Sequence, residues 1–223
     1  MHIKLFFEAI IKFMLGILII GLLIFIPANT LNYWNGWLLM ILLFIPMFMA
    51  GIVMMIKSPD LLKKRLDVKE KEIEQKRVVI YSGLMFIVGF IIAGLNYRYS
   101  WIQLPKTVII ISSIIFLLSY ILYAEVLREN VFLSRTIEVQ KEQKVIDTGL
   151  YGIVRHPMYS STLLLFLSMP LILGSIISFV IFLVYPFIIA KRINNEEKIL
   201  EKELMGYYEY KKKVKYKIIP FIW

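Results

Sequence analysis

The chain has 223 residues, of which 59% are hydrophobic, and its formal net charge is +10. A mean hydropathy of +0.74 excludes an ordinary soluble domain and predicts an integral membrane protein. The basic residues lie between apolar runs, as in cytoplasmic loops of membrane proteins, so the charge does not indicate nucleic-acid binding. Because the chain has no cysteine and only two histidines, we expect no disulfide and no metal site.

Four apolar runs approach the roughly 20 residues that a helix needs to cross a bilayer. They are Ala9–Ile26, Trp37–Ile56, Val78–Leu95 and Thr107–Val126. No small-residue cleavage site follows the first run, so we expect it to be a retained span. The loops between the first and second runs and between the third and fourth carry little charge and several aromatic residues, which is typical of the external side.

Residues 57–77 form a strongly basic segment, which the positive-inside rule places in the cytoplasm. Its apolar residues have partial helical spacing and favour an amphipathic helix on the membrane surface. The alternative is a solvated charged linker that only sets the orientation of the spans. Basic residues return between Arg128 and Arg155 and again from Lys191 onward, so we expect both termini to be cytoplasmic.

From Tyr159 to Ala190 the chain is apolar, but Gly174-Ser175 divides this run into two pieces that are each short for a full crossing. They form either two crossings or a re-entrant hairpin, and Pro170 and Pro186 should bend them. The predicted fold is therefore all-α: a polytopic transmembrane helical bundle of four long spans plus a C-terminal helical hairpin, with a cytoplasmic cap. We divide it into an N-terminal region of spans, 1–128, and a second region, 129–223.

The second histidine lies in a polar and aromatic stretch, Gly149–Tyr159, between two apolar regions. Proline disfavours helical conformation in the residue before it and suits the first turn of a helix. We therefore expect Pro157 to begin a helix and His156 to lie just outside it. Such a helix end, with Arg155 and His156 beside it, suits an anionic group of a ligand.

Two other polar groups are predicted on the same side of the membrane. One is the segment 134–140; the other is the segment 192–197 together with the tyrosine-rich tail that contains Tyr207, Tyr208 and Tyr210. On composition alone, all three groups could be loops that bind lipid phosphates.

The order of these motifs resembles the isoprenylcysteine carboxyl methyltransferase family, which is related to phospholipid methyltransferases. The motifs are Asp147–Tyr151, then Arg155-His156-Pro157-Met158-Tyr159, an apolar hairpin, the pair Glu196-Glu197, and a basic tail rich in tyrosine. The Arg-His-Pro-x-Tyr run alone is a weak signal, but its combination with a membrane hairpin and a Glu-Glu pair is specific. The resemblance makes 129–223 a methyltransferase region with a cofactor loop, a membrane hairpin and a C-terminal cap.

The resemblance implies S-adenosylmethionine as methyl donor, bound at the cytoplasmic face, and no metal. The implied cofactor-binding residues are Gln140, Thr148, Gly149, Leu150, Tyr151, His156, Tyr159 and one of Glu196 and Glu197. The implied catalytic residues are Arg192, which would hold the acceptor, and Arg155. The partners would be the lipid bilayer and a hydrophobic or small acceptor, most simply a carboxylate such as that of an isoprenylcysteine-like substrate.

Several alternatives remain open at this point. The acceptor could be a phospholipid amine or a small thiol, and a nicotinamide-dependent membrane reductase or a non-catalytic lipid-binding or scaffold protein would share the helical build. Arg155 could be an orientation charge, His156 a plain N-cap, the Arg192–Glu196 spacing an ordinary surface pair, and the tyrosines interface anchors. The sequence does not indicate the oligomeric state.

Overall fold

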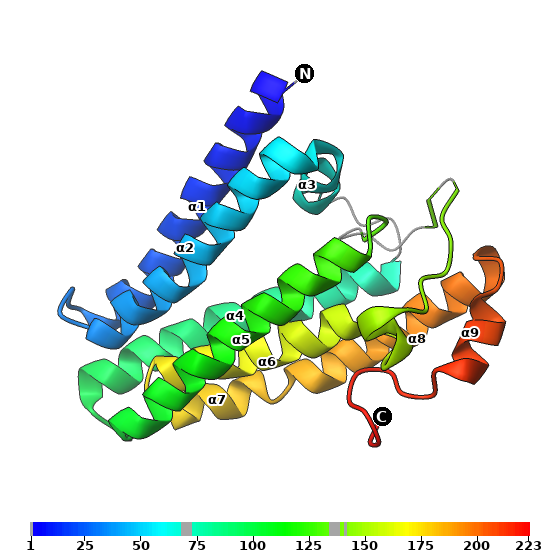
Figure 1. Cartoon of the computed structure of the whole chain (residues 1–223). Helices are drawn as coiled ribbons and strands as arrows, with labels where there is room; N and C mark the ends of the chain where they lie inside the picture. The colour runs from blue at the N-terminus through cyan, green and yellow to red at the C-terminus, as the bar shows by residue number, and fades with distance from the viewer. Residues whose placement is uncertain (1, 68–72, 134–138, 141) are drawn as a thin grey trace.

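A computed structural model describes residues 2–67, 73–133, 139–140 and 142–223, and within these ranges the regular elements are α-helices and one 3₁₀ turn. Figure 1 shows their arrangement. The elements are α1 (His2–Ala28), α2 (Trp34–Lys57), α3 (Pro59–Leu66), α4 (Ile73–Tyr99), α5 (Lys106–Glu129), the 3₁₀ turn η1 (Gly149–Gly152), α6 (Pro157–Ile172), α7 (Ile176–Phe182), α8 (Tyr185–Glu203) and α9 (Tyr207–Lys213).

The predicted all-α polytopic bundle is confirmed. Helices α1, α2, α4 and α5 and the segment Ile176–Glu203 are each long and apolar enough to cross a membrane. The helices extend beyond the apolar runs at both ends, because hydrophobicity marks only the part of a span in the hydrocarbon. Large apolar side chains on α1 and α2, such as Ile11, Leu18 and Ile45, are about half or more exposed, as expected for surfaces that face lipid.

The connecting segments gather at two opposite ends of the bundle (Figure 1). The α1–α2 and α4–α5 loops and the α6–α7 turn lie at one end, and the N-terminus, α3, α9 and the C-terminus lie at the other. The two ends separate the loops poor in charge from the basic segments, which agrees with the alternation expected from the sequence. The cytoplasmic orientation of the basic end stays a prediction.

The C-terminal hairpin reaches the same end as the other charge-poor loops. At its turn, Leu173 O accepts a hydrogen bond from Tyr33 Oη at 2.5 Å, and Gly174 O accepts one from Leu104 N at 3.4 Å. Because these hydrogen bonds hold the turn at the end of the bundle opposite the pocket, they favour two crossings over a shallow re-entrant loop. Pro186 lies in the first turn of α8, just after the break that separates α8 from α7, so it starts a helix rather than bending one.

Close helix contacts occur where glycine faces a neighbouring helix. A Cβ added at Gly89 of α4 would lie 2.3 Å from the ring of Phe182 on α7, and Ser178 Oγ donates to Gly89 O at 2.8 Å. Likewise, a Cβ at Gly94 would lie 2.6 Å from Ile24 O on α1. The absence of side chains at Gly89 and Gly94 thus lets α4 lie close to the Phe182 ring of α7 and to the backbone of α1.

The basic segment 57–77 begins with the surface helix α3, although residues 68–72 lie outside the described part of the chain. Helix α3 buries Leu62, and hydrogen bonds connect it both to α1 and to the loop after α5. Lys12 of α1 donates to Leu66 O at 2.7 Å, and Lys64 donates to Gln140 Oε1 at 2.6 Å. The short helix therefore links α1 to the polar segment that follows α5, instead of being a free linker.

Candidate active site

A pocket lies at the basic end of the bundle, between the loop after α5, the start of α6, the end of α8 and α9. Its empty space is about 820 Å³ when the part open to solvent is included. Predicted site residues in its wall are Tyr151, Arg155, His156, Tyr159, Arg192 and Glu196. Wall residues that the sequence analysis did not propose include Asn130, Phe132, Met158, Leu200, Leu204 and Tyr207.

The turn at Gly149 is held by the end of α5. Gly149 has φ +55°, and a Cβ there would lie 1.8 Å from the Glu129 carboxylate. The N–H of Leu150 donates to both carboxylate oxygens of Glu129, at 3.2 and 3.0 Å. Glycine is needed here because the left-handed backbone and the carboxylate leave no space for a side chain. Thr148, Gly149 and Leu150 thus build the turn and do not line the pocket.

Tyr151 projects from this turn into the pocket wall and is fixed at both ends. Its hydroxyl accepts a hydrogen bond from Asn130 Nδ2 at 2.9 Å, and its carbonyl accepts one from Tyr210 Oη at 2.7 Å. Burial raises the pKa values of Tyr151, Tyr207 and Tyr210 above the usual tyrosine range, so these phenols stay neutral. Hydrogen bonds of Tyr151 therefore connect the η1 turn both to the end of α5 and to α9.

His156 is placed as the sequence predicts. It is the residue just before α6, which begins at Pro157, and its side chain makes no capping hydrogen bond. Instead, its Nε2 lies 3.2 Å from Glu197 Oε1. The plain N-cap alternative is therefore wrong for the imidazole, which joins two distant parts of the chain.

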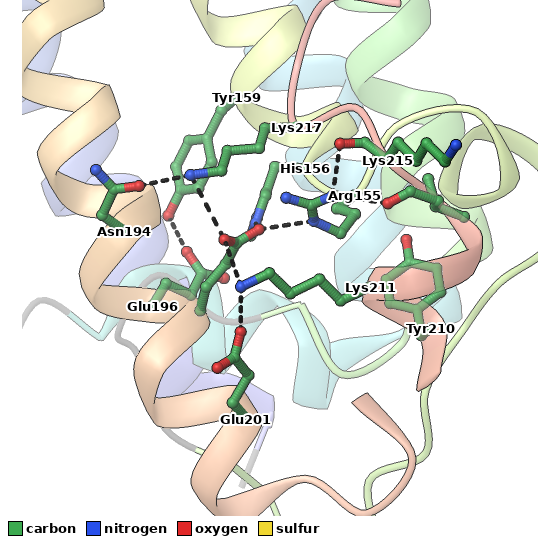
Figure 2. A network of polar contacts seen from close by, with 12 residues as sticks. Arg155, His156, Tyr159, Asn194, Glu196, Glu201, Tyr210, Lys211, Lys215 and Lys217 are labelled. Carbon is green, nitrogen blue, oxygen red and sulfur yellow. Dashed lines mark hydrogen bonds and ion pairs between the residues drawn. The ribbon is translucent and has the colours of Figure 1, made fainter. Parts of the chain in front are cut away.

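Arg155, which Figure 2 shows within a network of polar contacts, forms a buried ion pair with Glu197. Arg155 Nε donates to Glu197 Oε1 at 2.7 Å, and its Nη1 donates to the carbonyls of Val214 and Lys215 at 2.7 and 2.8 Å. The ammonium groups of Lys217 and Lys211 lie 3.5 and 3.8 Å from Glu197 Oε2. Glu197 thus anchors the tail and turns away from the pocket.

The tail pairs with the segment before α6 through the backbone as well. Arg155 N and His156 N donate to the carbonyls of Tyr216 and Lys217, at 2.9 and 2.8 Å. Ser160 Oγ donates to Ile218 O at 2.6 Å. Because Nε and Nη1 of Arg155 are already bonded to Glu197 and to carbonyls of the tail, the geometry favours a positioning role for this residue.

Glu196, one residue earlier on α8, faces the pocket. The hydroxyl of Tyr159 donates to Glu196 Oε2 at 2.6 Å and accepts from Arg192 Nε at 2.9 Å. Tyr159 is only 4% exposed, so it holds a carboxylate and a guanidinium on one rigid phenol. The Arg192–Glu196 spacing is therefore part of a bridged site in the pocket wall rather than an isolated surface pair.

Gln140 lies outside the pocket wall, and the segment 134–138 that precedes it is outside the described residues. The Gln140 amide joins α3 to the start of the loop that follows α5: it accepts from Lys64 and donates to Phe132 O. Its neighbours in the loop, Gln143 to Ile146, line the pocket instead.

Tyr207 and Asn130 are two of the wall residues that the sequence analysis did not assign to the site. The Tyr207 hydroxyl is buried and has no hydrogen-bond partner among the described residues. Asn130 follows the polar end of α5, and only its contact with Tyr151 reveals its place. The tyrosine-rich tail was the one available signal for Tyr207, but such residues more often anchor at interfaces.

Comparison with known proteins supports a function for this pocket. Residues 106–205 match the model of the phospholipid methyltransferase family. The match runs from the start of α5 past the end of α8 and includes η1 and the Tyr159 bridge. No curated protein matches the chain. The family includes proteins like isoprenylcysteine carboxyl methyltransferase, so the resemblance seen in the sequence is confirmed. Residues 106–205 of this chain, somewhat less than half of it, are therefore similar to the phospholipid methyltransferase family.

Proposed function

We propose that this protein transfers a methyl group from S-adenosylmethionine to an acceptor that reaches the pocket from the membrane, most simply a carboxylate. The observation that carries the proposal is the Tyr159 bridge, which places an acidic and a basic side chain in one pocket wall inside the family match. S-adenosylmethionine supplies a methyl group already activated by its sulfonium. The protein then has to orient the reactants and exclude water, and it needs no metal.

The wall offers groups that suit each part of the donor. Glu196 can accept from the donor's ammonium group. The Tyr207 hydroxyl, which has no hydrogen-bond partner within the described part of the chain, can bind a polar atom of the donor. Leu200 and Leu204 add an apolar surface against which an adenine can pack. Aromatic faces such as Tyr151 attract a cationic sulfonium. These features fit the donor and are the basis for assigning it.

Arg192 is assigned to the acceptor. A guanidinium can grip a carboxylate through two parallel hydrogen bonds and direct one oxygen at the methyl carbon. As the new O–C bond forms, the S–C bond breaks, its electron pair stays on sulfur, and the acceptor becomes a neutral ester. Arg155 and Glu197 are assigned to positioning, because both are used in anchoring the tail.

A phospholipid amine is the second candidate acceptor, favoured by the name of the matched family. An amine attacks in its neutral form and must lose a proton, for which the Glu196 carboxylate in the pocket wall is the candidate base. A labelled-donor screen of prenylcysteines, extracted phospholipids and small thiols would separate the candidates. Methylation of the phospholipid and not of the prenylcysteine would overturn the carboxylate assignment.

Donor binding can be tested without any acceptor. Calorimetric titration of detergent-solubilised protein with S-adenosylmethionine and its demethylated product should show saturable binding. We expect Glu196→Gln to weaken it roughly tenfold or more, whereas Glu203→Gln, an exposed carboxylate on the same helix, should leave it unchanged. If neither ligand bound saturably to the unmodified protein, the methyltransferase proposal would be wrong.

A further inference from the structure

The tail contains a closed turn, 218–223, whose base is attached to the bundle. The N–H groups of Ile218 and Ile219 both donate to Trp223 O at 3.0 Å, and Trp223 N donates to Ile219 O at 3.1 Å. The side chain of Ile218 belongs to the main hydrophobic core, and the Trp223 ring packs against that core. These contacts fix the position of the turn relative to the helices.

The tip of this turn is apolar and points away from the protein. Its side chains, Phe221 and Ile222, are 87% and 77% exposed. The Tyr216 ring lies beside the Phe221 ring, with 5.4 Å between the ring centres. At the base, Lys217 Nζ lies 4.9 Å from the centre of the Trp223 ring. Tyrosine, tryptophan and lysine are favoured where a protein meets lipid headgroups, so the residues around the tip fit a membrane interface.

Contacts with α6 and α8 place the turn at the level where these helices leave the lipid. Ser160 Oγ of α6 donates to the first carbonyl of the turn at 2.6 Å, and the half-exposed Leu164 lies one helical turn farther into the membrane on the same side of α6. On α8, Asn194 Oδ1 accepts from Lys217 at 2.6 Å (Figure 2), and the exposed Phe187 lies two turns farther in on the same side.

Exposed apolar side chains on membrane helices face lipid. The turn is therefore about 6–10 Å from lipid-facing side chains, which is comparable with the thickness of one headgroup layer. Figure 1 agrees with this level, because the C-terminal turn lies beside the bundle whereas α9 lies at its end.

The same tail is bonded to the candidate active site. Arg155 N and His156 N donate to the carbonyls of Tyr216 and Lys217, directly before the turn. A contact that holds the turn in the membrane therefore also limits how far the tail can separate from the start of α6. The turn lies outside the family match, which ends at residue 205.

We propose that the turn 218–223 is a membrane anchor. Phe221 and Ile222 insert between the headgroups and the acyl chains of the leaflet at the basic end of the bundle, and this contact restrains the tail at Arg155 and His156. The driving force is the burial of two large apolar side chains in lipid. The proposal goes beyond the proposed function and does not depend on the methyl donor or the acceptor.

Spin labels on single cysteines can measure the depth of the tip, because the chain has no cysteine of its own. The variants are Phe221→Cys and Ile222→Cys, each reconstituted as one chain per lipid nanodisc, with Phe187→Cys as the lipid reference. The matched control is Met205→Cys, at an apolar residue that is 96% exposed but lies between α8 and α9. We expect both tip labels to collide with oxygen as the reference does, and to be at least roughly tenfold less accessible than the control to a polar nickel chelate.

Two results would overturn the anchor. Tip labels as accessible to the chelate as the Met205→Cys label would place the tip in water. Labels protected from both the chelate and oxygen would place it against protein.

A charge at the tip tests both parts of the proposal. In the Ile222→Cys chain, Phe221→Asp should raise chelate accessibility roughly tenfold, because a carboxylate opposes insertion into lipid. Hydrogen exchange at the Arg155 and His156 amides should become roughly tenfold faster, since the tail separates more often. Tyr208→Asp, at an exposed aromatic residue of α9, should change neither quantity. An unchanged depth in Phe221→Asp would contradict the anchor, and equal exchange in the two aspartate variants would contradict the restraint of the tail.

Discussion

Glu197 on α8 accepts a hydrogen bond from Arg155 Nε at 2.7 Å, and both side chains are about 5% exposed, so the contact joins the start of α6 to the end of the last span inside the protein. The neighbouring carboxylate, Glu196, faces the pocket and binds Tyr159. Adjacent glutamates therefore have different tasks: one holds the fold of the site, and the other is available to a ligand.

Replacing Glu197 with alanine should destabilise the protein. The substitution leaves Arg155 and His156 buried without their carboxylate, and breaking a buried pair in this way costs about 3–5 kcal/mol. Glu196→Ala should change stability by less than about 1 kcal/mol and lose donor binding instead, because its carboxylate is only partly buried. Unfolding in detergent, followed by tryptophan fluorescence, would measure the difference. Equal stability of the two variants would contradict the division of tasks.

Tyr159→Phe should impair catalysis while the fold persists. The variant keeps the ring in the core but removes the hydroxyl that connects Glu196 with Arg192. Hydrogen bonds to charged groups contribute about 1.5–3 kcal/mol, so kcat/KM should fall roughly ten- to hundredfold. Tyr185→Phe is the matched control, since its buried hydroxyl contacts only the uncharged Thr162 Oγ1 at 3.2 Å among the contacts described. A similar loss in both variants would show that the bridge has no special role.

Gly149→Ala should disrupt the η1 turn, because the new Cβ would collide with the Glu129 carboxylate and the backbone is left-handed there. We expect a loss of about 1–3 kcal/mol in stability and weaker donor binding. In the double variant with Glu129→Ala the steric part should be relieved, so the two effects should not add. Gly83→Ala has open space around it within α4 and should be neutral or slightly stabilising. Strict additivity of the two substitutions would rule out the proposed clash.

The orientation of the bundle can be measured directly, because the chain has no cysteine of its own. Single cysteines at the exposed positions Asn32 and Lys106 should react with a membrane-impermeant maleimide from outside intact cells. Cysteines at the exposed positions Lys63 and Lys202 should react only after permeabilisation. The opposite labelling pattern would place the pocket outside the cell and contradict the positive-inside assignment.

The sequence by itself determined the elements that depend on local chemistry. Apolar length located the helices α1, α2, α4 and α5, because lipid requires about 20 consecutive apolar residues from any spanning helix. The alternation of basic and charge-poor loops separated the two ends of the bundle correctly. The geometry of proline placed His156 outside the helix that Pro157 begins, as the structure shows.

Only the tertiary structure decided which side chains share the pocket. Glu196 and Glu197 are adjacent and chemically identical, and the rotation of about 100° between neighbouring helix residues separates the ligand-facing one from the anchoring one. The carboxylate of Glu129 under Gly149 and the Tyr159 hydroxyl between Glu196 and Arg192 depend on contacts between distant segments. Spacing along the chain does not encode such contacts, because they arise from how the helices pack against one another.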